Sequence, residues 1–177
     1  MATPPLKYHK AQILLHSLSA VLIIIMLFAG LVVLPNLPDG GFKAFAVQMH
    51  MLTGIAIFFI TLLRIVLKKK LQQPIYASTG NAFLDKLGVV THYALNIVAL
   101  LVVLAGLGFA LSAGFWDVLW GTYILPARTD SALVGFFHEA HEILAFVLIG
   151  LIVLHVAGAL FHQFVLKDDL MSRMKPR

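Results

Sequence analysis

Four long apolar stretches, separated by short polar connections, dominate the hydropathy pattern of this chain. They cover about residues 13–34, 43–67, 87–111 and 136–165. About 20 apolar residues suffice for a helix to cross a bilayer, since each residue adds about 1.5 Å. The pattern therefore predicts an all-α integral membrane protein in which residues 1–177 form a single four-helix bundle.

The connections carry the signals expected of turns and membrane interfaces. The first apolar stretch ends at LPNLPDGG, whose prolines and glycines disfavour continuation of a helix. This stretch is longer than the apolar core of a signal peptide, and no small-residue cleavage site follows it, so we expect a retained span. The third connection carries Trp116, Trp120 and Tyr123, which we expect to anchor a short helix at the membrane surface.

Charged residues lie mostly at the ends of the predicted spans. The chain is 60% hydrophobic and 12% charged, with a net charge of +5. On one side lie 11 of its 13 basic residues: Lys7, Lys10, Arg64, Lys68, Lys69, Lys70, Lys86, Lys167, Arg173, Lys175 and Arg177. The other side has only Lys43 and Arg128. This asymmetry predicts that both termini are cytoplasmic, and it assigns the basic charge to the membrane rather than to a nucleic acid.

Histidines are the unusual feature of these apolar stretches. His141 and His155 are 14 residues apart. An α-helix brings two such positions to nearly the same face, about 21 Å apart along its axis. In the predicted orientation, His16 of the first stretch lies at about the same depth as His155, near the inner side of the membrane. His50 of the second stretch lies at about the same depth as His141, near the outer side.

Two imidazoles from facing helices suit haem b, whose iron takes four ring nitrogens and two axial ligands. Two such groups would form an electron path across the membrane. The chain has no cysteine, which excludes disulfides, thiolate-held iron–sulfur clusters, thiolate zinc sites and covalent haem attachment. His92 and His162 also lie toward the inner side, and His138 toward the outer, so they compete as ligands. Intramembrane histidines can also simply bridge helices by hydrogen bonds.

Arg64 and His162 are further candidates near the inner surface. Arg64 follows His50 by 14 residues and so lies on roughly the same face of its helix. Its planar guanidinium could pair with haem propionates, or it could extend to the lipid headgroups. His162 could hydrogen-bond a quinone or pass protons, or it could be an ordinary polar residue of the interface.

Four further residues near the candidate ligands can each be explained by function or by ordinary membrane-helix structure. Gly54 and Gly158 lie one turn beyond His50 and His155, where they would let a flat macrocycle approach, but small residues are also common at membrane helix contacts. Glu139 and Glu142 could orient a ligand imidazole, or they could be the acidic residues typical of a helix start.

Several motifs, in order along nearly the whole chain, resemble the bacterial cytochrome b561 family. These motifs are AQILLH, QMHMLTGI, LLRIVLKK, THYAL, GFWDVLWGTYILP, HEILAFVLIGLIVLH and ALFHQFVLKDDLMSRMKPR. The family comprises four-span dihaem proteins and includes the superoxide oxidase of bacterial inner membranes. The resemblance implies two non-covalent haems b, the inner one bound by His16 and His155 and the outer one by His50 and His141.

The resemblance also implies oxidation of superoxide at the outer face, with ubiquinone as the electron acceptor. The chain departs from the family in places that concern the donor. Ser17 and Ala140 stand where aromatic residues are expected, and His138 is an addition near the outer haem.

We therefore expect an inner-membrane oxidoreductase that moves electrons between an outer-face donor, with superoxide leading, and the ubiquinone pool. One alternative is a haem-bearing membrane anchor for another redox protein, which would be inactive without its partner. Another is a metal-ion transporter that uses the same histidines as a relay, although the spans contain few carboxylates to accompany a cation.

Overall fold

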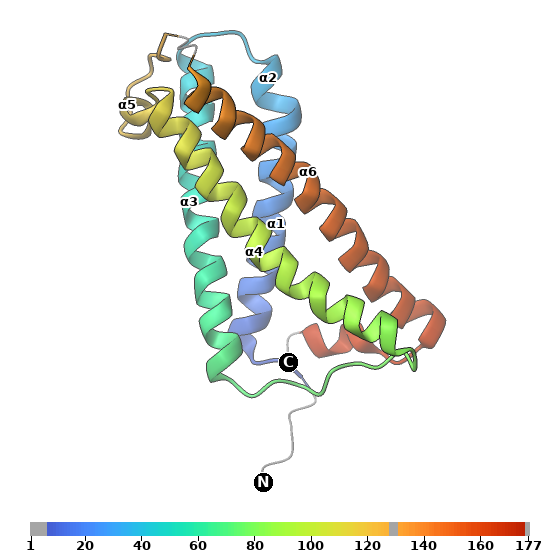
Figure 1. The fold of residues 1–177 in the computed structure, drawn as a ribbon. Coiled ribbons are helices and arrows are strands. Elements are labelled where there is room, and N and C mark those ends of the chain that lie inside the picture. Colours follow the sequence, from blue (N-terminus) through green and yellow to red (C-terminus); the bar gives the residue numbers. More distant parts are fainter. Residues whose placement is uncertain (1–6, 128–130, 176–177) are drawn as a thin grey trace.

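The computed structural model describes residues 7–127 and 131–175, and within these ranges the regular structure is entirely helical. Four long helical segments make up the fold, as Figure 1 shows. The first segment consists of α1 (Lys10–Phe28), a π-helical turn (Ala29–Val33) and α2 (Leu34–Asn36). The second and third are α3 (Gly41–Lys70) and α4 (Ala82–Ser112). The fourth is α6 (Ala132–Leu160), which continues into a second π-helical turn (Phe161–Leu166). Each is long and apolar enough to cross a membrane, which confirms the predicted helical membrane fold.

Side-chain caps explain where three of these helices begin. The ring of His9 accepts a hydrogen bond from the backbone N–H of Ala11. The backbone N–H of His9 in turn donates to the side-chain oxygen of Gln12, and the two bonds form a capping box at the start of α1. Asn81 caps α4, and the hydroxyl of Ser131 caps α6 through the N–H of Val134. These polar residues define the starts of helices whose apolar interiors carry no such signal.

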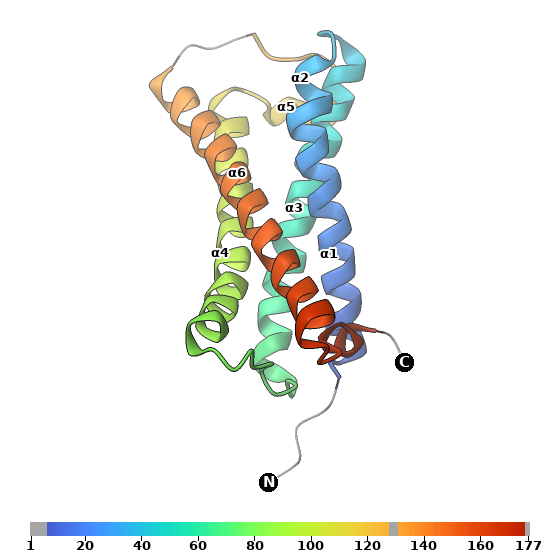
Figure 2. The ribbon, with the colours of Figure 1, turned by 90° about the vertical axis from the view of Figure 1, so that its right-hand side faces the viewer.

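The helices pack as two pairs. α4 lies against α6 along much of its length, and α1 lies against α3, as the two perpendicular views show (Figures 1 and 2). Lys10, where α1 begins, and the C-terminal 3-10 helix (Leu170–Met174) lie at the same end of the bundle. The connection between α2 and α3 lies at the opposite end, together with the short helix α5 (Trp116–Leu119).

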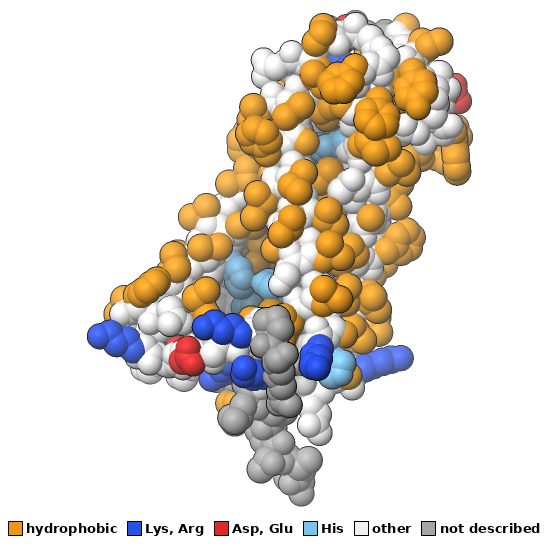
Figure 3. All heavy atoms as spheres, turned by 180° about the vertical axis from the view of Figure 1, so that it is seen from behind, with side chains coloured by type: hydrophobic (Ala, Val, Ile, Leu, Met, Phe, Trp, Pro, Cys, Tyr) orange, Lys and Arg blue, Asp and Glu red, His pale blue; other side chains and the backbone are white. Residues whose placement is uncertain are grey.

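The buried core consists largely of small side chains. Among the described residues, the buried apolar positions of α3, α4 and α6 include Ala44, Ala99, Ala105, Ala110 and Ala145. Large apolar side chains instead face outward over most of the surface (Figure 3). Small residues at helix contacts and large ones toward lipid are typical of membrane bundles, because lipid provides no hydrophobic force to drive helices together.

The two ends of the bundle differ in charge and aromatic content. Blue Lys and Arg side chains gather at the end where α1 begins (Figure 3). At the other end α5 forms the predicted short helix, with the Trp116 and Trp120 rings 5.6 Å apart. The Trp120 side chain is largely exposed, and Gln48 of α3 donates a hydrogen bond of 3.2 Å to the carbonyl of Leu119. This bond fixes the aromatic connection to the bundle.

Candidate functional site

Two histidine pairs form where helices distant in sequence face each other. His16 of α1 and His155 of α6 have ring centroids 6.1 Å apart, with planes at 72°. His50 of α3 and His141 of α6 have centroids 6.3 Å apart, with planes at 73°. The α6 helix thus contributes one ring to each pair, and the pairs stand at two depths in the bundle.

The spacing of both pairs fits a six-coordinate iron between the rings. An imidazole nitrogen lies about 2 Å from a first-row metal ion, and a five-membered ring with bonds of about 1.35 Å has a radius of about 1.1 Å. Two ligands on opposite sides of one ion therefore have centroids about 6.2 Å apart. No group of three or more His, Cys, Asp or Glu residues gathers within the described part of the chain, so an iron ion between the rings of either pair would take its other ligands from a cofactor.

The pair of His50 and His141, predicted to be the outer one, has a hydrogen bond of the kind that orients ligand histidines. His141 Nδ1 lies 2.8 Å from the carbonyl oxygen of Val102 and donates to it, which leaves Nε2 with a lone pair. The Nδ1 atom of His50 is buried and has no hydrogen-bond partner among the described residues. A buried polar atom without a partner costs free energy, and within the described ranges the His50 ring lacks a hydrogen bond like the one that orients His141.

A cavity of about 1300 Å³ surrounds the outer pair. His50, His141 and the exposed His138, Glu139 and Glu142 all line it. The cavity is therefore large, mostly apolar in its walls, and lined by acidic side chains near its histidines.

Two glycines allow helices to approach the outer histidine rings. A Cβ on Gly106 of α4 would stand 2.8 Å from Cε1 and Nδ1 of His141, and one on Gly30 would stand 3.2 Å from Cε1 of His50. Gly30 lies in the π-helical turn Ala29–Val33, and such turns are frequent at functional sites. Gly54 lines the cavity, whereas nothing lies within 4 Å of a Cβ on Gly158.

Arg64 lies beside the inner pair. Its guanidinium donates to the hydroxyl of Ser19 at 3.0 Å and to Nδ1 of His16 at 3.2 Å. Ser19 is fully buried and donates in turn to the carbonyl of His16. Because a guanidinium only donates, Nδ1 of His16 is an acceptor in this arrangement. Arg64 therefore points into the bundle, where it could meet an anionic group of a cofactor.

Comparison with known proteins assigns the chain to a family. The sequence model of the family described as Prokaryotic cytochrome b561 matches residues 7–177. The chain belongs to the prokaryotic cytochrome b561 family. It is 27% identical over 174 residues to "Cytochrome b561 homolog 1" of Escherichia coli (strain K12), covering 97% of this chain and 98% of that protein. It is 24% identical over 172 residues to "Probable superoxide oxidase CybB" of Yersinia pestis, covering 97% of each.

Membership in the cytochrome b561 family makes this chain a multi-pass, haem-binding membrane protein of electron transfer. The predicted family and the predicted helical membrane class are thereby confirmed. Haem b is a non-covalent group held by axial side chains, which agrees with the absence of cysteine and with the two histidine pairs.

Two further histidines of this cytochrome lie near the pairs. His92 of α4 packs edge-on against His155, with centroids 4.9 Å apart, which is too short for an iron ion between the rings. His138 packs against Phe109 of α4 at 5.1 Å. The sequence predicted His92 toward the inner side as a competing ligand, but it did not predict the contact with His155, because that contact depends on how α4 crosses α6.

His162 lies apart from both pairs, in the π-helical turn that ends the fourth span. Its Nδ1 donates to the carboxylate of Asp168 at 2.6 Å, and its side chain is only 12% exposed. Lys167 and Asp169, on either side of Asp168, both have left-handed backbones with φ of 55° and 54°. Such strain in non-glycine residues persists where the surroundings impose it, and it concentrates at functional sites.

The carboxyl of Asp168 remains charged at neutral pH. Its partial burial alone would raise the pKa, but the hydrogen bonds from His162 and from the backbone N–H of Leu170 bring the pKa below its ordinary value. A carboxylate in this position fixes the proton of His162 on Nδ1 and leaves Nε2 facing away from it.

Proposed function

We propose that this cytochrome is a dihaem oxidoreductase that carries electrons from superoxide at the outer face of the bacterial inner membrane to ubiquinone near the inner face. His50 and His141 would hold the outer haem b, and His16 and His155 the inner one. The observation that carries the proposal is the presence of two histidine pairs with centroid separations of 6.1 and 6.3 Å at two depths of one bundle. The Yersinia relative is named a probable superoxide oxidase, which supports superoxide as the donor.

The haems, when bound, supply reversible one-electron chemistry. The protein supplies the ligand atoms and their orientation. Val102 keeps the proton of His141 on Nδ1, so Nε2 is the ligand atom. Arg64 would turn from His16 toward the propionates of the inner haem, and this would free Nδ1 of His16 to carry a proton.

The distribution of basic residues supports a single orientation in the inner membrane. Lys and Arg side chains concentrate at the end of the bundle that holds the start of α1 and the C-terminal 3-10 helix (Figure 3). Since basic residues are retained in the cytoplasm, this end faces inward and the end with α5 faces outward. The donor would then meet the outer cavity.

His162 and Asp168 would serve the quinone. Two superoxide ions each lose one electron and leave as O₂, and one ubiquinone takes both electrons and two protons to become ubiquinol. The ring of His162 presents Nε2 at the inner edge of the span, where it can hydrogen-bond a quinone oxygen and deliver a proton. The Asp168 carboxylate would hold the ring in place, with its proton on Nδ1 and Nε2 toward the quinone.

The proposal is tested by following ubiquinone reduction in liposomes that hold the purified protein and receive superoxide from an enzymatic generator. We expect His162→Ala to slow quinone reduction by about 100-fold while both haems are retained, because a positioned acid–base group contributes on the order of 10²–10⁴ in rate. Asp168→Asn should have a smaller effect in the same direction. Lys69→Ala, an exposed position at the end of α3 outside the cavity around the outer pair, is the control and should leave the rate of quinone reduction nearly unchanged.

Two results would count against the proposal. An unchanged rate in His162→Ala would remove His162 from the quinone site. Failure of the unmodified protein to consume superoxide, with both haems present, would leave the electron path but reject superoxide as donor.

A further inference from the structure

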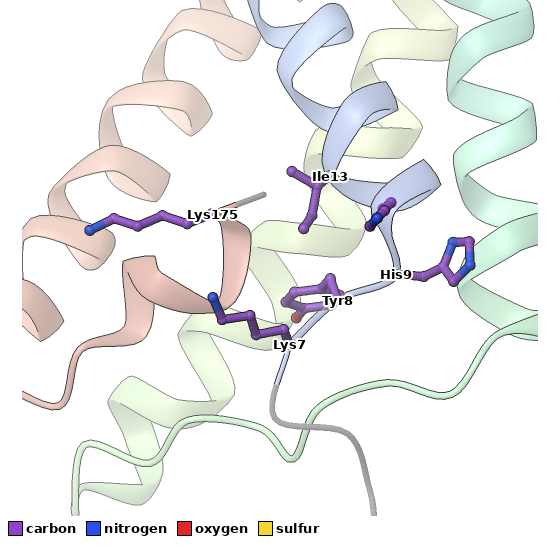
Figure 4. A pocket seen from close by; sticks show the side chains of 6 residues that line it. Lys7, Tyr8, His9, Ile13 and Lys175 are labelled. Atoms are coloured by element: carbon purple, nitrogen blue, oxygen red, sulfur yellow. The ribbon is translucent and has the colours of Figure 1, made fainter. Parts of the chain in front are cut away.

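A second cavity lies at the inner end of the bundle, away from both histidine pairs. It has a volume of about 230 Å³ and is lined by Lys7, Tyr8, His9, Lys10, Ile13 and Lys175. Figure 4 shows Lys7 and Tyr8 on the segment that leads into α1, and Ile13 in α1 itself. The C-terminal segment that carries Lys175 lies beside them, and the Lys175 side chain extends away from Lys7 and Tyr8. Three of the six described lining residues are lysines, and none is acidic.

Hydrogen bonds hold the segments around this cavity together. The backbone N–H of Tyr8 donates to the carbonyl of Arg173 at 3.2 Å, and the guanidinium of Arg173 donates to the carbonyl of Ile75 at 2.5 Å. Gln12 of α1 donates to Gln73 of the connection before α4. The N-terminal segment, the second connection and the C-terminal segment are thus fixed to one another, and the cavity is preformed.

The lysine charges around this cavity are not paired with acidic side chains in the part of the chain that the structure describes. No ion-pair partner for the ammonium groups of Lys7, Lys10 and Lys175 occurs among the described residues. Burial raises the pKa of Tyr8, so its phenol keeps its proton and can donate a hydrogen bond. Three lysines and a neutral hydroxyl around one small hollow suit an anion with several oxygen atoms, such as a phosphate group, because lysine side chains are flexible enough to turn toward a bound anion.

The surface beside the cavity is apolar. Lys10 lies at the start of the first span, and Leu14, Leu18 and Val21 follow it at helical spacing on the same side of α1. These three side chains are exposed by 67%, 42% and 55%. A basic hollow at the end of a span, followed by an exposed apolar stripe, matches the two parts of a phospholipid, the headgroup and the acyl chain.

We propose that this cavity binds the phosphate-bearing headgroup of an anionic phospholipid of the adjacent leaflet, with an acyl chain along Leu14, Leu18 and Val21. The site joins the segment before α1 to the C-terminal segment. The site is separate from both histidine pairs. Disproof of lipid binding would therefore leave the proposed electron-transfer function unaffected.

The experiment measures binding of phosphatidylglycerol to the purified holoprotein by native mass spectrometry, with phosphatidylcholine as the zwitterionic comparison. We expect a tightly held phosphatidylglycerol in the unmodified protein. The triple variant K7Q/K10Q/K175Q should bind it about 100-fold more weakly, because each basic residue near an anionic lipid contributes a factor of about five.

The matched control is K69Q/K70Q/K86Q, which removes the same charge from exposed lysines at the same end of the bundle, outside the cavity. We expect its phosphatidylglycerol affinity to stay within about two-fold of the unmodified protein. An equal loss of phosphatidylglycerol affinity in both triple variants would show that general surface charge causes the binding, and it would contradict a specific site in this cavity. Haem absorbance should be the same in all three proteins.

Inorganic phosphate distinguishes a lipid from a free anion. We expect millimolar phosphate to compete weakly with phosphatidylglycerol, because it lacks the acyl chain. Leu18→Gln, which places a polar group on the apolar stripe, should weaken phosphatidylglycerol binding and leave phosphate binding unchanged. Full displacement by phosphate, or equal binding of phosphatidylcholine, would overturn the assignment to an anionic lipid.

Discussion

The inner and outer histidine pairs have nearly the same ring separation but different surroundings. At the outer pair His141 donates to the carbonyl of Val102, and Gly106 leaves room for its ring. At the inner pair Arg64 donates to Nδ1 of His16, and His92 packs against His155. The α6 helix thus carries one histidine oriented by a backbone carbonyl and, at another depth, one histidine whose partner His16 accepts from a guanidinium.

This difference has an electrostatic consequence. A positive guanidinium near a haem stabilises the reduced form, which has one more electron, whereas the exposed Glu139 and Glu142 stabilise the oxidised form of the group beside them. The proposed inner haem should therefore have the higher reduction potential. Electrons entering at the outer face would then move inward spontaneously.

The largest expected effect comes from removing one ligand of each pair. His50→Ala and His155→Ala should each lose about half of the haem, because an iron with one axial ligand and an empty position opposite is held much more weakly. The ratio of haem to protein, measured by the pyridine haemochrome method, checks this. His138→Ala should keep both haems, and loss of haem in that variant would show that His138 is a ligand.

A substitution that reduces the space around the His141 ring should weaken haem binding at one pair and not at the other. Gly106→Ala would force a methyl group against His141, and overpacking of this kind costs about 1–3 kcal/mol. We expect the affinity for the outer haem to fall by roughly 5- to 150-fold while the inner haem is retained.

Gly150 of the same bundle provides the control for this substitution. Nothing lies within 4 Å of a Cβ at this position, so Gly150→Ala should keep both haems at full occupancy. Full retention of the outer haem in Gly106→Ala would contradict the placement of His141 at that haem.

Arg64→Gln tests the electrostatic side of the comparison. Removal of one positive charge about 10 Å from the inner iron should lower its reduction potential by on the order of 50–100 mV, for an effective dielectric constant of about 20. The outer haem should shift little. A redox titration followed by absorbance resolves the two haems, and an equal shift at both would show that Arg64 does not act on the inner haem alone.

The smallest effect is expected at the mouth of the outer cavity. Glu139 and Glu142 line this cavity and are exposed, and they repel an anionic donor such as superoxide. The double variant E139Q/E142Q should react with superoxide about 3-fold faster at low ionic strength, and the difference should shrink as salt is added. A slower reaction would indicate that the donor is not an anion.

The sequence predicted much of this architecture, for identifiable physical reasons. Hydropathy alone indicates the four long helices, because backbone polar groups cannot stay unpaired in lipid. Helical periodicity brings His141 and His155 to one face, and the placement of His16 and His50 opposite them follows from alternating span directions. Their role as iron ligands remains a prediction.

Other contacts could not be read from the sequence. The approach of His92 to His155 depends on the crossing of α4 and α6, which periodicity does not define. The bond between His162 and Asp168 depends on a π-helical turn and two left-handed residues that reverse the chain. The contact of Gly106 with His141 depends on the same crossing of α4 and α6 and was not predicted.

The most direct test of the two-haem account is the haem content and the reduced-minus-oxidised absorption spectrum of the purified protein, recorded before and after superoxide is added. The account predicts two low-spin haems b per chain, both with bis-imidazole spectra, and their rapid reduction by superoxide. One haem per chain, or none, would contradict the assignment of the two histidine pairs.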